Sequence, residues 1–236
     1  MDNGFEIQRR LARVTRYNCW LYDSFRDHLG ARILDAGCGY GNVTRFLLQG
    51  RERVIGLDHS PAFYEAVRDR FASRDSFRAV LGDLADAGLL ASLAGERLDT
   101  VVCVNVLEHL KDDVAALGAF HALLPPGGAL VLLVPAHGWL FGSLDRADAH
   151  YRRYSRRGLA GRVREAGFRV VELRWLNLAG IAGWFLNGTI LRRTFVPEAQ
   201  YAAYDRIVPL LRAIESRVPV PIGLSLLCIG SKSPGP

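Results

Sequence analysis

The sequence predicts an α/β fold built on a doubly wound parallel sheet. Five apolar stretches of strand length alternate with segments that carry apolar residues at helical spacing. The first of these stretches runs directly into a glycine-rich turn, and the second ends in an aspartate. The chain has 236 residues, of which 50% are hydrophobic, and this suits one large domain with a full core.

A pair of amphipathic helices is predicted before the first strand, over residues 5–29. The strand and the turn after it, residues 32–42, read RILDAGCGYGN, and helical spacing resumes at Val43. Strand, glycine turn and helix start together form a nucleotide-binding βα unit, in which glycine permits positive φ and a close ligand. A dinucleotide fingerprint would have its third glycine at position 42, which is Asn42 here.

The segment 35–41 resembles motif I of the class I S-adenosylmethionine-dependent methyltransferases, because its third glycine comes one residue early and an acid precedes the turn. In that family the glycines pack against the methionine part of the cofactor. A glycine turn without a ligand is the alternative. The cofactor-binding residues that the resemblance implies here are Asp35, Ala36, Gly37 and Gly39.

The same resemblance implies that residues 1–30 form a helical lid over the cofactor. Tyr17 and Trp20 are its candidate contacts, in a segment that is unusually aromatic and polar for a core face. Plain packing of these two side chains onto the sheet is an equal alternative.

The second strand, residues 53–58, ends in Asp58. In this fold an acid at that place lies against the ribose hydroxyls, and two acceptor oxygens suit a vicinal diol. His59 follows, and Pro61 stands at a favoured first helical position. A helix cap is the other explanation of Asp58, but its distance from the glycine turn favours the ligand.

The third strand, residues 77–83, leads into Gly82, Asp83 and Leu84, and residues 85–97 suggest a short helix. The Gly-Asp pair resembles the family's adenine contact, where the carboxylate accepts from the exocyclic amine and the glycine leaves room for the flat base. A simple turn is the alternative.

The fourth strand, residues 98–105, continues into Val106-Leu107-Glu108-His109-Leu110, which looks like the family's motif after this strand. The motif implies that Asn105 and Val106 line the cofactor and that His109 stacks or hydrogen-bonds nearby. Glu108 is equally explained as a charge at a helix start. After a helix over 112–124 and a Pro-Pro-Gly-Gly turn, the fifth strand, 129–135, is apolar throughout and therefore central.

Residues 136–154 form a loop rich in reactive groups, at the sheet edge where ligands bind. We predict that it forms the acceptor wall, with His150 as general base because imidazole titrates near neutral pH. A structural cluster that braces the next helix is an equal alternative for His150, and Arg152 and Arg153 would alternatively grip an anionic acceptor. The candidate acceptor contacts are His137, Trp139, Tyr151, Arg153 and Trp184.

A helix over 155–167 and two strands, 168–177 and 223–232, complete the core. The 142–154 loop resembles a bacterial small-molecule branch of the family, which also carries a hydrophobic insert before its last strand. The resemblance covers residue 32 to about residue 175 and the final strand. It implies a mostly parallel, seven-stranded sheet, with strand seven antiparallel between strands five and six.

The predicted regions are the lid 1–30, the core 31–177 with 221–236, and a helical insert 178–220 before the last strand. The apolar segment 178–191 is too short for a membrane span, and an amphipathic helix follows it. We favour an insert that caps the acceptor pocket or pairs with a second subunit. The alternative is a membrane interface, with Trp184 inserted and arginines at the headgroups.

The net charge of +6 comes without a dense basic run, which argues against a nucleic-acid substrate. Four widely spaced cysteines fit neither a zinc site nor a disulfide scaffold, and the N-terminus does not resemble a signal peptide. We therefore expect a cytoplasmic protein without a metal. We also expect a monomer or a homodimer. The predicted function is S-adenosylmethionine-dependent methyl transfer to O or N of a small molecule, such as a secondary-metabolite intermediate. The alternatives are a lipid-linked acceptor, a nicotinamide-dependent oxidoreductase and a non-catalytic methyltransferase-like partner protein.

Overall fold

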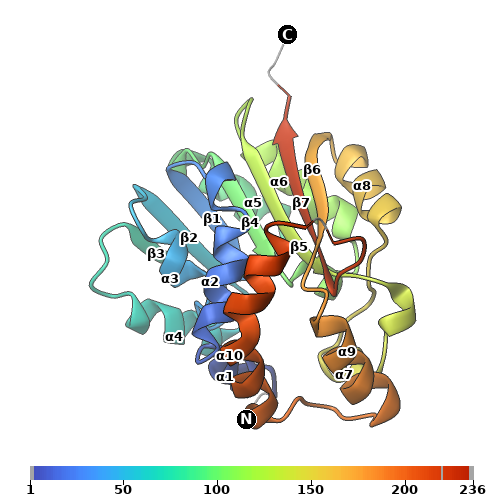
Figure 1. Ribbon diagram of the computed structural model, residues 1–236. Helices are drawn as coiled ribbons and strands as arrows, with labels where there is room; N and C mark the ends of the chain where they lie inside the picture. The colour runs from blue at the N-terminus through green and yellow to red at the C-terminus, as the bar shows by residue number, and fades with distance from the viewer. Residues whose placement is uncertain (1–2, 219, 234–236) are drawn as a thin grey trace.

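A single seven-stranded sheet with helices on both faces forms the protein (Figure 1). The structure is a computed structural model that describes residues 3–218 and 220–233. The outer ends of two predicted regions, residues 1–2 and 234–236, and position 219 of the insert lie outside the described residues.

The strand order is β3-β2-β1-β4-β5-β7-β6, and it confirms the predicted doubly wound sheet. β7 lies between β5 and β6 and is antiparallel to both, whereas the other pairings are parallel. The strands are β1 Arg32–Ala36, β2 Arg53–Asp58, β3 Phe77–Leu81, β4 Thr100–Val104, β5 Ala129–Pro135, β6 Phe168–Leu176 and β7 Ser225–Lys232.

The chain reverses its direction of winding at β1, which pairs with β2 on one side and β4 on the other. In open α/β sheets, ligands bind beyond the carboxyl ends of the strands at such a switch point. The turns after β1, β2 and β4 therefore face one crevice.

Two layers of helices cover the sheet. One face packs against α2, α3, α4 and α10 through a cluster that includes Leu21, Leu47, Val67 and Val208. The other face packs against α5, α6 and α8. These helices are α2 Thr15–Asp23, α3 Thr44–Leu47, α4 Pro61–Arg70, α5 Ala87–Ser92, α6 Asp113–Leu123, α8 Arg156–Glu165 and α10 Glu198–Glu215.

Three further helices, α1 Asn3–Leu11, α7 Ser143–Ala147 and α9 Gly180–Phe185, lie beyond the carboxyl ends of the parallel strands (Figure 1). α7 belongs to the 136–154 loop, and α9 with a π-helical turn, Leu186–Ile190, opens the insert. α10 then returns to pack beside α2. Within the described part of the chain, no helix has both the length and the hydropathy of a membrane span.

Candidate active site

A cavity of about 750 Å³ lies at the switch point, a size typical of small-molecule sites. One wall is formed by the turns after β1, β2, β3 and β4. Residues 147–151 and Arg153 form another wall, and residues of α1, α2, α9 and α10 close the remaining side. Segments from both ends of the chain and from its centre therefore meet around one space.

The glycine turn after β1 takes positive φ at three glycines, Gly37 (+77°), Gly39 (+52°) and Gly41 (+76°). A Cβ atom on Gly37 would lie 2.4 Å from the side chain of Val106. At Gly39 the nearest atom is the end of the Gln8 side chain, 3.6 Å away. Gly37 is therefore required by packing, whereas the space at Gly39 opens into the cavity.

Asp58, at the end of β2, accepts hydrogen bonds from the turn after β1 and from the turn after β2. Its Oδ2 accepts the Gly39 N–H at 2.9 Å, and its Oδ1 accepts the Ser60 N–H at 3.0 Å. Each carboxylate oxygen can accept a second hydrogen bond, and the side chain borders the cavity. The predicted ribose contact therefore has free acceptor sites and stays a prediction.

Asp35, the acid before the glycine turn, accepts the Thr44 hydroxyl at 2.6 Å. Burial raises the pKa of Asp35 to about 7, although this hydrogen bond acts in the opposite direction. Ala36 is buried in the core under the turn. Of these two predicted cofactor residues, only Asp35 is among the described residues that border the cavity.

The residues predicted to contact adenine, in the turn after β3, differ in their surroundings. Asp83 and Leu84 border the cavity, and Asp83 accepts the Ala85 N–H at 2.8 Å. A Cβ atom on Gly82 would lie 2.1 Å from the Leu89 side chain. Packing against Leu89 therefore explains the glycine without a bound base.

The two predicted lid contacts, Tyr17 and Trp20, lie in different environments. Tyr17 borders the cavity, and its backbone N–H donates to Asp205 of α10 at 2.9 Å. Trp20 is buried in the core cluster beneath α2, as its packing alternative expected. His59 borders the cavity with a side chain that is 81% exposed.

The end of β4 brings four residues of the predicted motif to the cavity. Asn105 has a φ of +52°, and its N–H donates to the Leu133 carbonyl at 2.8 Å, so the chain turns sharply here. Asn105, Val106, Glu108 and His109 all border the cavity. Glu108 and His109 lie on a short 3-10 turn, Leu107–His109.

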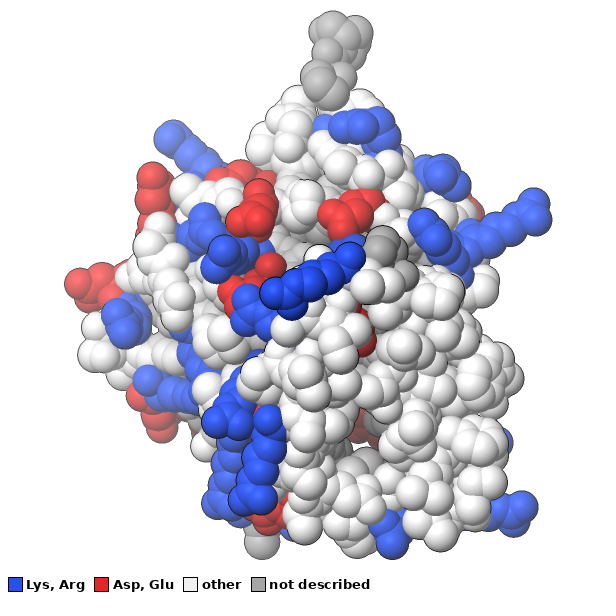
Figure 2. Space-filling view, in the orientation of Figure 1, with Lys and Arg blue, Asp and Glu red and all other residues white. Residues whose placement is uncertain are grey.

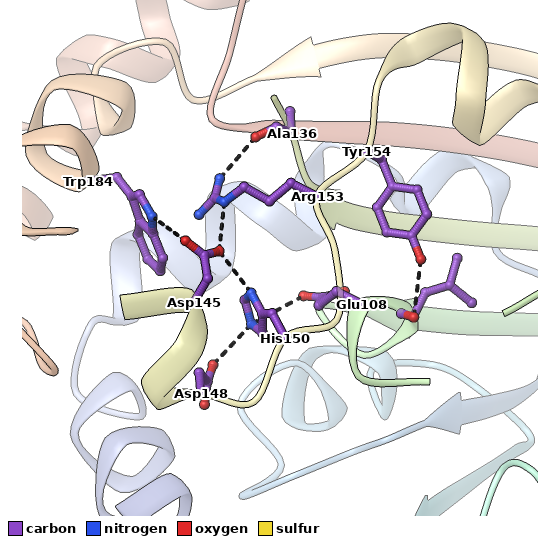
Figure 3. A network of polar contacts seen from close by, with 9 residues as sticks. Glu108, Ala136, Asp145, Asp148, His150, Arg153, Tyr154 and Trp184 are labelled. Atoms are coloured by element: carbon purple, nitrogen blue, oxygen red, sulfur yellow. Dashed lines mark hydrogen bonds and ion pairs between the residues drawn. The ribbon is translucent and has the colours of Figure 1, made fainter. Parts of the chain in front are cut away.

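His150 lies between carboxylates (Figure 3). Its Nδ1 is 3.0 Å from Asp145 Oδ1, its Nε2 is 3.2 Å from Asp148 Oδ2, and Nε2 is 4.0 Å from Glu108 Oε1. Burial lowers the pKa of His150, but the hydrogen bonds to Asp145 and Asp148 outweigh it and raise the pKa to about 9. Burial and the nearby His150 lower the pKa of His109 to about 4.

Asp145, on α7, is the centre of this network. It accepts from Arg153 Nε at 2.6 Å, from the Gly142 N–H at 2.9 Å and from Trp184 Nε1 at 3.2 Å (Figure 3). The Arg153 guanidinium also donates to the Ala136 carbonyl and lies 4.7 Å from the centre of the Trp184 ring. Arg153 and Trp184 therefore fix the loop against the insert.

The remaining acceptor candidates lie in two places. Tyr151 borders the cavity, and its N–H donates to the Glu108 carbonyl at 2.9 Å. His137 stacks on Trp175 at 4.6 Å, and Trp139 is 58% exposed next to Phe185. Neither His137 nor Trp139 is among the described residues that border the cavity.

Sequence reasoning missed Glu108 as a site residue. Its side chain is 1% exposed, and neither carboxylate oxygen has a hydrogen-bond partner among the residues that the structure describes. Burial raises the pKa of Glu108 to about 7, although the nearby His150 lowers it. The Glu-His dipeptide was visible in the sequence, but nothing in it showed that Glu108 is buried.

Glu108, His109 and His150 each bring one potential ligand atom within 4.8 Å of the others, which is close enough for a metal ion. A metal ligand must be a neutral imidazole with a free lone pair. Both ring nitrogens of His150 face carboxylates, so its protonated form fits this arrangement better than a metal-bound form.

Comparisons with known proteins identify relatives of this chain. A family model described as a methyltransferase domain matches residues 7–173. A ubiquinone biosynthesis O-methyltransferase of Xanthomonas euvesicatoria is 28% identical over 172 residues, covering 65% of this chain and 71% of the relative. Another, from Cereibacter sphaeroides, is 35% identical over 102 residues, covering 43% and 40%.

Solved structures share the fold. The YcgJ protein of Bacillus subtilis has a TM-score of 0.60 at 16% identity, covering 92% of this chain and 99% of its own. The cyclase SpnF has a TM-score of 0.60 at 16% identity, covering 94% and 81%. The match of the family model over most of the chain shows that the protein belongs to the class I S-adenosylmethionine-dependent methyltransferases.

Proposed function

We propose that the protein transfers a methyl group from S-adenosylmethionine to an oxygen of a small molecule with an apolar, aromatic body. The observation that carries this proposal is one cavity with two unlike walls. Motif acids border it on the sheet side, and Tyr17, Phe195, Tyr201 and Tyr204 border it on the other. Oxygen is favoured because the relatives of this chain are O-methyltransferases by name.

The residues present fit the cofactor. The open space at Gly39 admits a ligand close to the backbone, and Asp58 keeps free acceptor sites for a diol. Asp83 and Asn105 border the same cavity. When bound, S-adenosylmethionine supplies an activated methyl group on a positive sulfur, which the surrounding acids stabilise.

Two sequence-based proposals, the cytoplasmic location and a role of His150 at the acceptor, remain open to test. The nicotinamide and non-catalytic alternatives are replaced by the family assignment. The unpaired cysteines support a cytoplasmic location. His150 lines the cavity, and its role towards the acceptor remains a proposal.

Incubation with methyl-labelled S-adenosylmethionine and a panel of phenols, alcohols and anilines tests this proposal. We expect label in the phenols, and more of it in those with larger apolar bodies. Transfer to anilines alone would contradict an oxygen acceptor, and transfer to none of them with intact cofactor binding would contradict a small aromatic acceptor.

A second candidate function, methylation of a membrane-associated acceptor, is favoured by the outer surface of the insert. Figure 2 shows that the surface over α9 carries few charges. The described segment 178–218 contributes ten exposed large hydrophobic side chains: Leu178, Phe185, Leu186, Ile190, Leu191, Phe195, Ile207, Leu210, Ile214 and Val218.

On α10 these residues form one stripe, because Ile207, Leu210 and Ile214 follow at intervals of three and four. Arg206 and Arg217 are exposed and lie three or four positions from stripe residues, so they flank it. An apolar stripe flanked by cations fits an anionic bilayer surface.

Co-sedimentation with vesicles of phosphatidylcholine, with and without phosphatidylglycerol, tests this second candidate. Salt-sensitive binding that Leu210→Glu abolishes would support it. Val171→Glu, which changes an exposed residue of β6, is the matched control. A protein that stays in the supernatant, or a dimer that Leu210→Glu dissociates, would contradict it.

A further inference from the structure

Glu108 is a buried carboxylate that accepts no hydrogen bond from the residues that the structure describes. Its side chain is 1% exposed, and within the described residues neither of its oxygens accepts a hydrogen bond. Leaving a buried acceptor without a donor is unfavourable, and more so when the acceptor carries a charge. Glu108 is one of the residues that line the cavity, although both of its carboxylate oxygens are covered. A ligand in the cavity can supply the missing donor once the side chain turns towards it.

The other acids of the network already have partners. Asp145 accepts from Arg153, Gly142 and Trp184. Asp148 faces the Nε2 of His150 at 3.2 Å and is partly exposed to solvent. Of the carboxylates drawn in Figure 3, Glu108 alone is both buried and free of donors among the described residues.

The surroundings of His150 identify its protonation state. A neutral imidazole has one N–H and one lone pair, so it can donate to only one carboxylate. His150 has Asp145 at one nitrogen and Asp148 at the other. Burial lowers the pKa of His150, but these two carboxylates raise it to about 9 and so favour the imidazolium, which has no lone pair to take a proton. Its Nε2 lies 4.0 Å from Glu108 Oε1.

We propose that Glu108 is the group that removes the proton from the acceptor hydroxyl, and that His150 is a positioning residue that keeps Glu108 ionised. This inference rests on the proposed methyl transfer to oxygen. The acceptor O–H bond breaks, and its proton goes to a Glu108 oxygen. The oxygen electron pair forms the bond to the methyl carbon, and the carbon–sulfur bond breaks with its electron pair left on sulfur.

After the methyl transfer, Glu108 carries the acceptor's proton and is a neutral carboxylic acid. Asp148 faces the Nε2 of His150, whereas Asp145 faces the Nδ1 on the other side of the ring. The Asp148 side chain is 41% exposed and therefore contacts solvent. The proton can leave towards solvent at this side of the cavity once the product has gone.

The test uses S-adenosylhomocysteine to fill the cofactor part of the cavity and para-nitrophenol as the acidic hydroxyl. The phenolate and the phenol differ in absorbance, so proton transfer is measured directly. We expect the wild type to bind the probe as phenolate. Glu108→Gln should reduce the phenolate signal about ten-fold or more. Glu65→Gln, the matched control at an exposed residue of α4 outside the cavity lining, should retain it.

A phenolate signal that survives Glu108→Gln would overturn the proposal, and so would a wild type that binds only the neutral phenol or none. A signal that a chelator removes and Mg²⁺ or Zn²⁺ restores would assign the cluster to a cation instead. A wild type that does not bind S-adenosylhomocysteine would count against the proposed function. Failure of the proposed function and failure of the Glu108 proposal are therefore distinguishable.

Infrared difference spectra give a second readout that needs no acceptor. The carboxyl band that disappears in Glu108→Gln should titrate near neutral pH in the wild type. In His150→Gln it should titrate at higher pH, because a positive neighbour has been removed. A band whose midpoint is unchanged by His150→Gln would contradict the positioning role.

Discussion

His150 links the charge network to the stability of the whole protein, and His150→Gln measures this link. The folded protein raises the pKa of His150 from 6.5 to about 9, through Asp145 and Asp148 and against burial. A shift of one unit corresponds to about 1.4 kcal/mol, so the full effect is about 3 kcal/mol. The side chain is 5% exposed, so solvent screening removes little of it.

The sign follows from the direction of the shift. Because the folded pKa lies above the unfolded one, the stabilisation is fully present below pH 6.5 and is lost as the pH rises through about 9. The difference in the free energy of unfolding between the wild type and His150→Gln should therefore depend on pH. The wild type's advantage should be about 3 kcal/mol larger at low pH than at high pH.

Urea unfolding at several pH values checks this prediction. The same pair of proteins in a Glu108→Gln background removes the second titrating carboxyl group from the comparison. Asp148→Asn should move the window to lower pH, because one of the two carboxylates next to the His150 ring is lost. A difference between wild type and His150→Gln that is constant with pH would refute the assigned protonation.

Three further substitutions test other parts of the structure. Asp58→Ala should weaken S-adenosylmethionine binding by about 1–3 kcal/mol in calorimetry, because a hydroxyl pair loses its acceptor. Gly37→Ala should lower the melting temperature and abolish cofactor binding, since its Cβ would lie 2.4 Å from Val106 at positive φ; Gly95→Ala, with no atom within 4 Å, should do neither. Tyr154→Phe should cost about 1–3 kcal/mol in urea unfolding, since its buried hydroxyl hydrogen-bonds Asp113 at 2.8 Å.

The features that depend on neighbouring residues could be predicted from the sequence. The apolar run, the glycine spacing and the acid at the end of β2 are local patterns, and they predicted β1, its turn and β2 within a few residues. The place of β7 between β5 and β6 followed from the family resemblance and is confirmed. No local pattern in β7 would have revealed it.

Side-chain contacts between distant segments could not be predicted. Gly82 suggested room for a base, but the space is taken by Leu89 from the following helix. Trp20 and Tyr17 share one aromatic segment, and only the direction of α2 places one in the core and the other at the cavity. Glu108 meets His150 because the loop after β5 folds back over the end of β4.

Isothermal titration calorimetry of the purified protein with S-adenosylmethionine, S-adenosylhomocysteine and NAD tests the central claim most directly. We expect that the first two bind at one site, that Asp58→Ala weakens both, and that NAD gives no heat. Binding of NAD alone, or of none of the three, would contradict a cofactor site built on the turn after β1.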